Sequence, residues 1–115
     1  MEVKKIYYMD CDLHGRQYHD ADEVWEKLKV GTVLQLVRDA DNKYDHNAVA
    51  VVYNDEETKE EHCIGYIPKS ENKDLAAFLE MGWTDIFECR INQIRTEVHP
   101  DHQISMTIKI KKREK

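Results

Sequence analysis

Apolar and polar residues alternate along several short stretches of the chain, and a period of two is the pattern of half-buried β-strands. The most continuous apolar run, residues 48–53 (AVAVVY), has the length of a buried strand and is far too short to span a membrane. The sequence predicts six strands. They cover residues 6–9, 32–37, 48–53, 62–68, 87–92 and 106–110.

Two other segments place apolar residues at helical spacing. The first, residues 20–31, opens on an aspartate cap and stops at Gly31, and the second, about residues 72–81, is stopped by Gly82. Their apolar faces consist of Val24, Trp25 and Leu28 in the first segment and Leu75, Phe78 and Leu79 in the second. We therefore expect two short amphipathic helices.

Six strands and two short helices, with no regular alternation between them, predict a mainly β fold. Closure into a small antiparallel β-barrel would remove the exposed edges of so many short strands. The 115 residues suffice for one domain, expected over residues 1–115 with its core between about residues 5 and 110. Trp25, Phe78 and Trp83 are expected in that core.

The charge of the chain argues against a basic coat for indiscriminate binding along nucleic acid or anionic lipid. The formal charge is −6, from 23 acidic and 17 basic side chains. Acidic residues gather in residues 20–26 and 55–61, whereas residues 109–115 form a basic tail. A local basic face therefore remains compatible with the acidic total.

The cysteines and the N-terminus predict a soluble, cytoplasmic protein without membrane contact. Cys11, Cys63 and Cys89 are odd in number and widely separated, which suits thiols in a reducing compartment better than disulfides. The first residues contain no apolar stretch of signal-peptide length.

A dense polar segment, residues 39–47, separates two of the predicted strands and is compatible with several kinds of site. An EF-hand calcium loop does not fit, because Lys43, Tyr44 and Ala50 stand where a ligand, a glycine and a bidentate glutamate are needed. The chain has no catalytic motif, so we expect neither an enzyme nor a cofactor. A metal-assisted nuclease using Asp39, Asp41 and Asp45 is a further alternative.

Structural zinc is not expected, because no second pair of ligands stands at a recognisable spacing. Cys11, His14 and His19 form the one grouping near the N-terminus that stays open as a zinc site.

Four segments together resemble a HIRAN domain over about residues 5–110. They are GRQY (15–18), LKVGTVLQLVRDADNKYDHNAVAV (28–51), IGYIPK (64–69) and LAAFLEMG (75–82). The resemblance implies a compact OB-like or SH3-like β-barrel that binds single-stranded DNA and has a pocket for a free 3′-hydroxyl end. It also implies a context of DNA repair or stalled replication forks, but no ATPase segment is present in this chain.

The resemblance assigns roles to individual residues. Asn42, Tyr44 and Asp45 match the family's pocket loop, in which the tyrosine packs against a terminal nucleotide and the carboxylate accepts a hydrogen bond from the terminal hydroxyl. Tyr18 matches a second aromatic residue and Lys69 a phosphate-binding lysine.

Two positions depart from the better-known relatives. Gln17 replaces a basic residue, with Arg16 one place away, and Tyr66 replaces a histidine. The expected nucleic-acid-binding residues are Arg16, Gln17, Tyr18, Asn42, Tyr44, Asp45, Tyr66 and Lys69.

Two alternatives stay open for these residues. Asn42 and Asp45 are ordinary turn formers, so loop structure alone accounts for them as well. The domain as a whole is alternatively a protein-interaction module, acting through a barrel face or the acidic residues 55–61 as accessory to a separately encoded helicase or nuclease.

Overall fold

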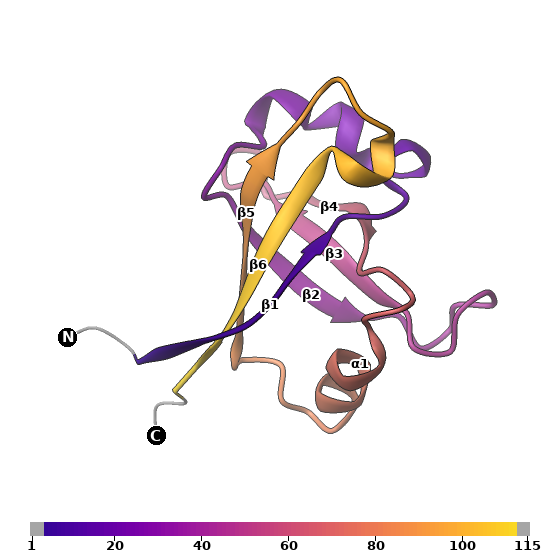
Figure 1. Cartoon of the computed structure of the whole chain (residues 1–115), viewed down its shortest axis with the longest axis vertical. Coiled ribbons are helices and arrows are strands. Elements are labelled where there is room, and N and C mark those ends of the chain that lie inside the picture. The colour runs from indigo at the N-terminus through magenta and orange to yellow at the C-terminus, as the bar shows by residue number, and fades with distance from the viewer. Residues whose placement is uncertain (1–3, 113–115) are drawn as a thin grey trace.

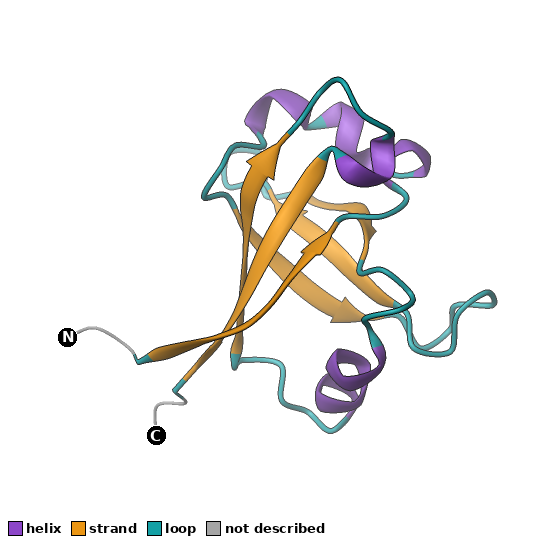
Figure 2. Cartoon of the chain, viewed as in Figure 1, coloured by secondary structure: helices purple, strands orange, loops and turns teal. Residues whose placement is uncertain are grey.

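The computed structural model describes residues 4–112, apart from the side chain of Gln17, and the end of the expected basic tail, residues 113–115, lies outside the described part. These described residues form six strands, one α-helix and four short 3-10 helices (Figures 1 and 2). The strands are β1 (Lys5–Asp12), β2 (Val33–Arg38), β3 (Val49–Asn54), β4 (Glu61–Tyr66), β5 (Phe87–Ile94) and β6 (Ile104–Lys111). The helices are η1 (Arg16–Tyr18), η2 (Asp20–Glu23), η3 (Trp25–Lys27), α1 (Lys73–Glu80) and η4 (Pro100–His102).

The strands form one antiparallel sheet in the order β1-β6-β5-β2-β3-β4, so the expected mainly β fold is confirmed. Alternation explains the packing, because Leu34 and Leu36 of β2 are buried while the residues between and beside them are exposed. In β6, Ile104, Met106 and Ile108 are buried, while the residues between them are partly exposed. In the described part of the chain, no helix is both long and apolar enough to cross a membrane.

The expected closed barrel does not form. The edge strands β1 and β4 meet at one bridge just beyond β1, where His14 N donates to Tyr66 O at 2.9 Å and Tyr66 N donates to His14 O at 2.8 Å. Past this bridge the chain turns away at Gly15, whose φ of 74° is left-handed, and at Pro68, which has no N–H to donate. The sheet therefore curls and touches itself at a single point.

Gly65 makes this contact sterically feasible. A Cβ atom at this position would lie 2.6 Å from the carbonyl oxygen of His14 and 2.7 Å from Cδ1 of Leu13. A side chain here would push the two edges apart, so the glycine of the IGYIPK segment serves the close approach of two backbones.

The predicted helix over residues 20–31 is wrong. The chain instead makes the two 3-10 helices η2 and η3, interrupted at Val24 with φ −118° and ψ 12°. Ala21 and Val24 are both buried, and a 3-10 helix places residues three apart on the same side. Burial of this pair outweighs the α-helical pattern of the segment.

The second predicted helix is confirmed as α1, which buries Leu75 and Leu79 and ends before Gly82 at φ 95°. The expectation of a core position is wrong for Phe78 and Trp83, which are partly exposed, whereas Trp25 is half-buried and packs against the core. Figure 1 shows α1 at one end of the molecule and the 3-10 helices at the other.

Candidate functional site

A cavity of about 550 Å³ opens beside the His14–Tyr66 bridge. Its walls come from three segments far apart in sequence: residues 14–19, the loop of residues 39–47 with Ala48 just before β3, and residues 66–69. We call residues 39–47 the pocket loop, and in Figure 1 it projects from the sheet between β2 and β3. The lining residues are His14, Gly15, Tyr18, His19, Asn42, Tyr44, Asp45, Ala48, Tyr66, Ile67 and Lys69. The volume lies within the range of about 300–1,000 Å³ that is usual for ligand pockets.

Asn42 determines the shape of the pocket loop. Its Oδ1 atom accepts hydrogen bonds from the backbone N–H of Tyr44 at 2.9 Å and of Asp45 at 3.1 Å. Its Nδ2 atom donates to Asp39 Oδ2 at 3.2 Å. The side chain of Asn42 is thus committed to an Asx turn that presents the two following residues.

The carboxylate of Asp45 is held from two sides. Oδ1 accepts from the backbone N–H of Asn47 at 2.9 Å, and Oδ2 accepts from Nδ2 of Asn72, the N-cap residue of α1, at 2.7 Å. A carboxylate has about four acceptor sites, so each oxygen retains capacity for a further donor. Asp45 is therefore positioned by loop and helix together and still able to accept from a ligand.

Two tyrosines line the cavity with their side chains largely in solvent. Tyr44 is 90% exposed and Tyr18 is 78% exposed. Tyr18 follows the left-handed turn at Gly15, whose N–H donates to Asp101 Oδ1 at 2.8 Å and so anchors this wall. Aromatic rings this exposed beside a cavity bring little to the fold and offer apolar faces to a ligand.

Tyr66 belongs to the wall of the cavity. Its hydroxyl donates to Asp39 Oδ2 at 2.6 Å, and its ring centroid lies 5.1 Å from that of His19. Burial raises the pKa of Tyr66, and the hydrogen bond to Asp39 raises it further. The phenol stays protonated at neutral pH and is already engaged, so Tyr66 offers chiefly its ring.

Lys69 is the one lysine or arginine among the residues that line this cavity. Its side chain is exposed, and Nζ lies 3.5 Å from the backbone carbonyl oxygen of Tyr44. A long flexible cation with one weak contact can reach a phosphate near the cavity without a large loss of existing bonds.

Arg16 lies elsewhere. Its guanidinium carbon lies 4.2 Å from the ring centroid of Trp25, and the group donates to Gln103 Oε1 at 2.9 Å and pairs with Asp22. It lines a separate cavity of about 640 Å³. The structure thus brings together Tyr18, Asn42, Tyr44, Asp45, Tyr66 and Lys69 but not Arg16, and the side chain of Gln17 is outside the described part.

Sequence reasoning missed three contributors. His14 enters through the strand bridge, His19 through its contact with Tyr66, and Asn72 through its bond to Asp45. Asn72 opens the second predicted helix and is the N-cap residue of α1, yet its side chain makes no capping hydrogen bond. The sequence carried no signal for contacts between segments so far apart.

The expected metal alternatives near this cavity do not fit the geometry. Cys11 is buried in the core, and burial raises the pKa of its thiol to about 12, so it is not available to join His14 and His19 around zinc. Of the three carboxylates in the nuclease alternative, Asp45 lines the cavity, whereas Asp39 and Asp41 are not among its lining residues.

A small curled β-sheet with solvated aromatic rings and a lysine around one cavity has the features of a ligand-binding module. Residues 6–113 match the family model of the HIRAN domain, so the chain belongs to the HIRAN domain family. This family is known as a nucleic-acid-binding module.

The fold is shared with a solved protein. A crystal structure of a structural-genomics target from Lactobacillus plantarum superimposes with a TM-score of 0.76 at 18% identity, covering 97% of this chain and 100% of that one. A likeness at this identity shows the fold alone. The search of curated proteins found no match.

Proposed function

We propose that the cavity binds the 3′-terminal nucleotide of single-stranded DNA and selects ends that carry a free hydroxyl. The observation that carries this proposal is the placement of Tyr18 and Tyr44, both largely exposed and from separate segments, around the same cavity as Asp45. One acid beside two aromatic faces suits a ligand with a flat ring and a hydroxyl donor.

The tyrosine rings supply most of the affinity in this proposal. Stacking of a base on an aromatic side chain contributes roughly 1–3 kcal/mol and tolerates any base, because every base has a π-face. Tyr18 and Tyr44 already stand in solvent, so no rearrangement of the core is needed before they stack. We expect binding with little sequence preference.

Asp45 supplies the selection of the end. A carboxylate accepts hydrogen bonds and repels other anions, so it favours a terminal hydroxyl and disfavours a terminal phosphate. The bonds from Asn47 and Asn72 hold it in place before the ligand arrives. Selectivity thus comes from a fixed acceptor.

Lys69 supplies the contact to the backbone phosphates. Single strands lose affinity with a slope of log K against log salt of about −0.7 for each phosphate neutralised. With Lys69 as the one lysine or arginine lining the cavity, the expected slope is between about −0.7 and −1.4. A much steeper slope would assign binding to the basic residues 109–115 instead.

Fluorescence anisotropy with short labelled strands tests the proposal. We expect a 3′-hydroxyl strand to bind more tightly than the same strand with a 3′-phosphate, and neither strand to be cleaved when magnesium is present. Equal affinity for the two strands would remove the role of Asp45, and binding of neither strand would contradict the proposed function. Cleavage would favour the nuclease alternative.

We further propose that this binding serves DNA repair or replication-fork processing, which rests on the family resemblance. A partner such as a helicase or nuclease is part of the same expectation. One variant distinguishes the interaction-module alternative from DNA binding in the cavity. A partner protein captured equally by wild type and Tyr44→Ala would not use the cavity. The exposed acidic residues 56–61 would then be the first surface to mutate.

A further inference from the structure

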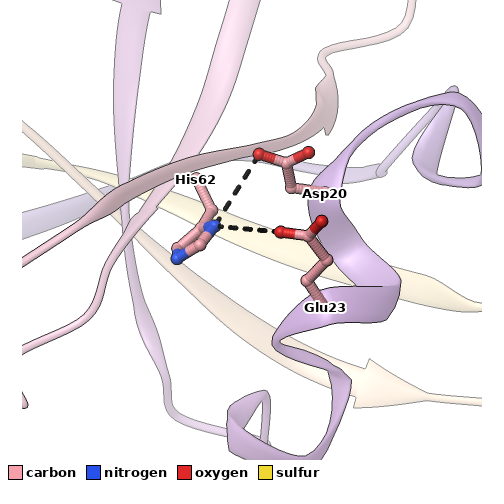
Figure 3. A group of neighbouring side chains, drawn as sticks. All are labelled: Asp20, Glu23 and His62. Carbon is pink, nitrogen blue, oxygen red and sulfur yellow. Dashed lines mark ion pairs between the residues drawn. The ribbon is translucent and has the colours of Figure 1, made fainter. Parts of the chain in front are cut away.

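A second cluster of ligand-type side chains lies outside the cavity, between η2 and β4. It consists of Asp20, Glu23 and His62, whose candidate ligand atoms all lie within 4.8 Å of one another (Figure 3). Nδ1 of His62 is 3.7 Å from Asp20 Oδ2 and 3.9 Å from Glu23 Oε2. The ring nitrogen therefore points at both carboxylates.

The backbone accounts for this convergence. Asp20 and Glu23 are three residues apart in η2, and a 3-10 helix completes one turn in three residues, so the two side chains leave the helix on the same side. His62 comes from β4, where it pairs with Tyr53 of β3. Two rigid elements thus set the positions of the three groups.

The imidazole of His62 is buried but poorly satisfied. Its side chain is only 10% exposed, and among the described residues its ring nitrogens have no hydrogen bond within 3.5 Å. Separations of 3.7–3.9 Å are too long for hydrogen bonds, so the ring nitrogens keep their capacity for another partner. Ligands of one metal ion, bound at about 2.0–2.2 Å, lie roughly 3.0–3.6 Å apart. The exposed carboxylates need to move only slightly to share an ion.

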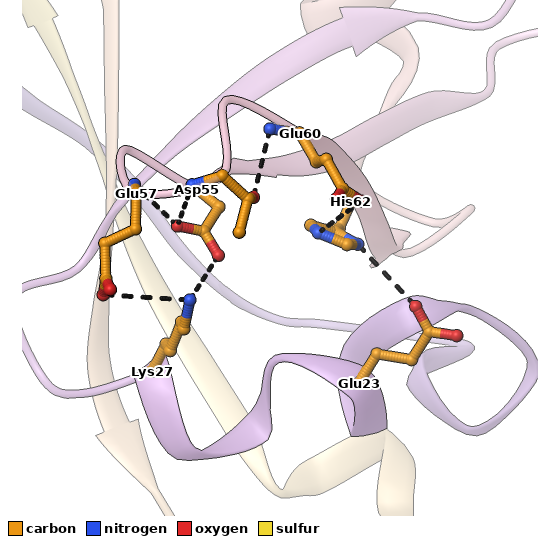
Figure 4. A network of polar contacts seen from close by, with 7 residues as sticks. Glu23, Lys27, Asp55, Glu57, Glu60 and His62 are labelled. Atoms are coloured by element: carbon orange, nitrogen blue, oxygen red, sulfur yellow. Dashed lines mark hydrogen bonds and ion pairs between the residues drawn. The ribbon is translucent and has the colours of Figure 1, made fainter.

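The charge around the ring favours a cation. Glu60 Oε2 lies 3.9 Å from Nε2, the other ring nitrogen, so three carboxylates surround one imidazole. The nearby Lys27 is engaged elsewhere. Figure 4 shows Lys27 paired with Asp55 at 2.5 Å and with Glu57 at 3.8 Å.

Glu60 lies on the side of the ring where an outer partner would stand, and its Oε2 would have to approach from 3.9 Å to accept a hydrogen bond from Nε2–H. Histidines that bind a metal through one nitrogen usually donate the other N–H to a carboxylate, which fixes the tautomer and orients the ring. Glu60 on the Nε2 side leaves Nδ1 as the ligand atom, and Nδ1 is the nitrogen that faces Asp20 and Glu23.

We propose that His62, Asp20 and Glu23 bind a first-row divalent metal ion of the Zn²⁺ class, with Glu60 orienting the imidazole. Three protein ligands leave a coordination position for water, and a nitrogen ligand favours Zn²⁺ over Mg²⁺ or Ca²⁺, which prefer oxygen. The ion would fasten η2 to β4. This inference does not depend on nucleic-acid binding.

Calorimetric titration of the full chain with Zn²⁺, followed by thermal unfolding with and without the ion, tests the site. We expect one saturable site and a higher unfolding midpoint with Zn²⁺, and no comparable shift with Mg²⁺. Glu60→Gln should weaken Zn²⁺ binding about 10- to 100-fold, as loss of an outer partner does. His62→Gln should abolish the shift.

Asp20→Asn and Glu23→Gln test the site even if the His62 variant fails to fold. Both carboxylates are exposed, so their loss leaves the core intact. Each should lower Zn²⁺ affinity at least 10-fold. His102→Gln is the matched control, since His102 faces Asp12 at 2.9 Å in an exposed pair. The proposal is overturned if wild type shows no saturable binding, or if His102→Gln removes binding and the η2 and β4 variants do not.

Discussion

Replacing Asp45 by asparagine should remove the distinction between two kinds of DNA end. The carboxylate lines the cavity and retains acceptor capacity on both oxygens. Asparagine has nearly the same shape, carries no charge and presents an NH₂ group in place of one oxygen. The variant thus changes the charge and acceptor count while leaving the tyrosines in place.

The size of the effect follows from two opposing interactions. A hydrogen bond from the terminal hydroxyl to a charged acceptor contributes about 1.5–3 kcal/mol. Repulsion between Asp45 and a terminal phosphate 4 Å away is about 4 kcal/mol at an effective dielectric constant of 20, and an open cavity lowers this. Taking about 1.5–3 kcal/mol for the difference, wild type should prefer the 3′-hydroxyl strand roughly 10- to 150-fold. The asparagine variant should prefer it less than about threefold.

The variant should remain folded. Its remaining oxygen can still accept from the backbone N–H of Asn47, and its NH₂ group would face Asn72. Oδ1 of Asn72 is buried and has no hydrogen-bond partner in the described part of the chain, so a rotation of that amide supplies the acceptor. We expect a loss of about 0.5–1.5 kcal/mol in the free energy of unfolding.

Competition anisotropy measures the ratio of the two dissociation constants for wild type and variant in the same buffer. Asp41→Asn is the matched control, because Asp41 is an exposed aspartate of the same pocket loop that does not line the cavity. Asp45 does not select the DNA end if Asp45→Asn keeps the wild-type ratio, or if Asp41→Asn loses it to the same extent.

Three further changes probe the rings, the bridge and the acidic hairpin. Tyr44→Ala should weaken DNA binding about 5- to 150-fold, from roughly 1–3 kcal/mol of lost stacking, with no change in the unfolding midpoint. Gly65→Ala should cost about 1–3 kcal/mol of stability, because its Cβ meets backbone at 2.6 Å, and should weaken DNA binding as well. The hydrogen bond from Lys27 lowers the pKa of Asp55 in the folded protein. The stability lost in Asp55→Asn should therefore be largest above the unfolded-state pKa of about 4. This loss should vanish as the pH falls through the lower folded-state pKa of Asp55.

Each of these outcomes has a control or a contradicting result. Tyr7→Ala removes another exposed tyrosine, 62% accessible and outside the cavity, and equal losses in both tyrosine variants would contradict a stacking role. Unchanged thermal unfolding of Gly65→Ala would show that the bridge is not tight. Glu56→Gln, in the same hairpin as Asp55, should leave the pH dependence of the unfolding midpoint as in wild type.

The strands and α1 were predictable because their signals are local. Alternation at Leu34 and Leu36, and the spacing of Leu75 and Leu79, record which face each element buries. The segment of residues 20–31 misled because its apolar residues fit two helix types, and the packing of Ala21 against the rest of the fold selects the 3-10 form.

In the candidate site, too, local features were predictable and contacts between distant segments were not. The turn at Asn42 and the tyrosine beside it lie within one short segment, so a resemblance in sequence could identify them. The backbone bridge at His14 and the hydrogen bond from Asn72 join segments that are distant in sequence. The residues next to His14 and Asn72 in the sequence do not indicate either contact. Arg16 was assigned to the binding site because it lies next to Gln17 and Tyr18 in sequence. In the structure its side chain packs on the ring of Trp25, away from the cavity.

Amide chemical-shift mapping of the labelled full chain with a short 3′-hydroxyl DNA strand tests the central claim most directly. We expect shifts to gather at Tyr18, at residues 42–45 and at residues 66–69, and to weaken when the same strand ends in a phosphate. Shifts confined to the basic C-terminal residues, or spread evenly over the sheet, would contradict a binding site in this cavity.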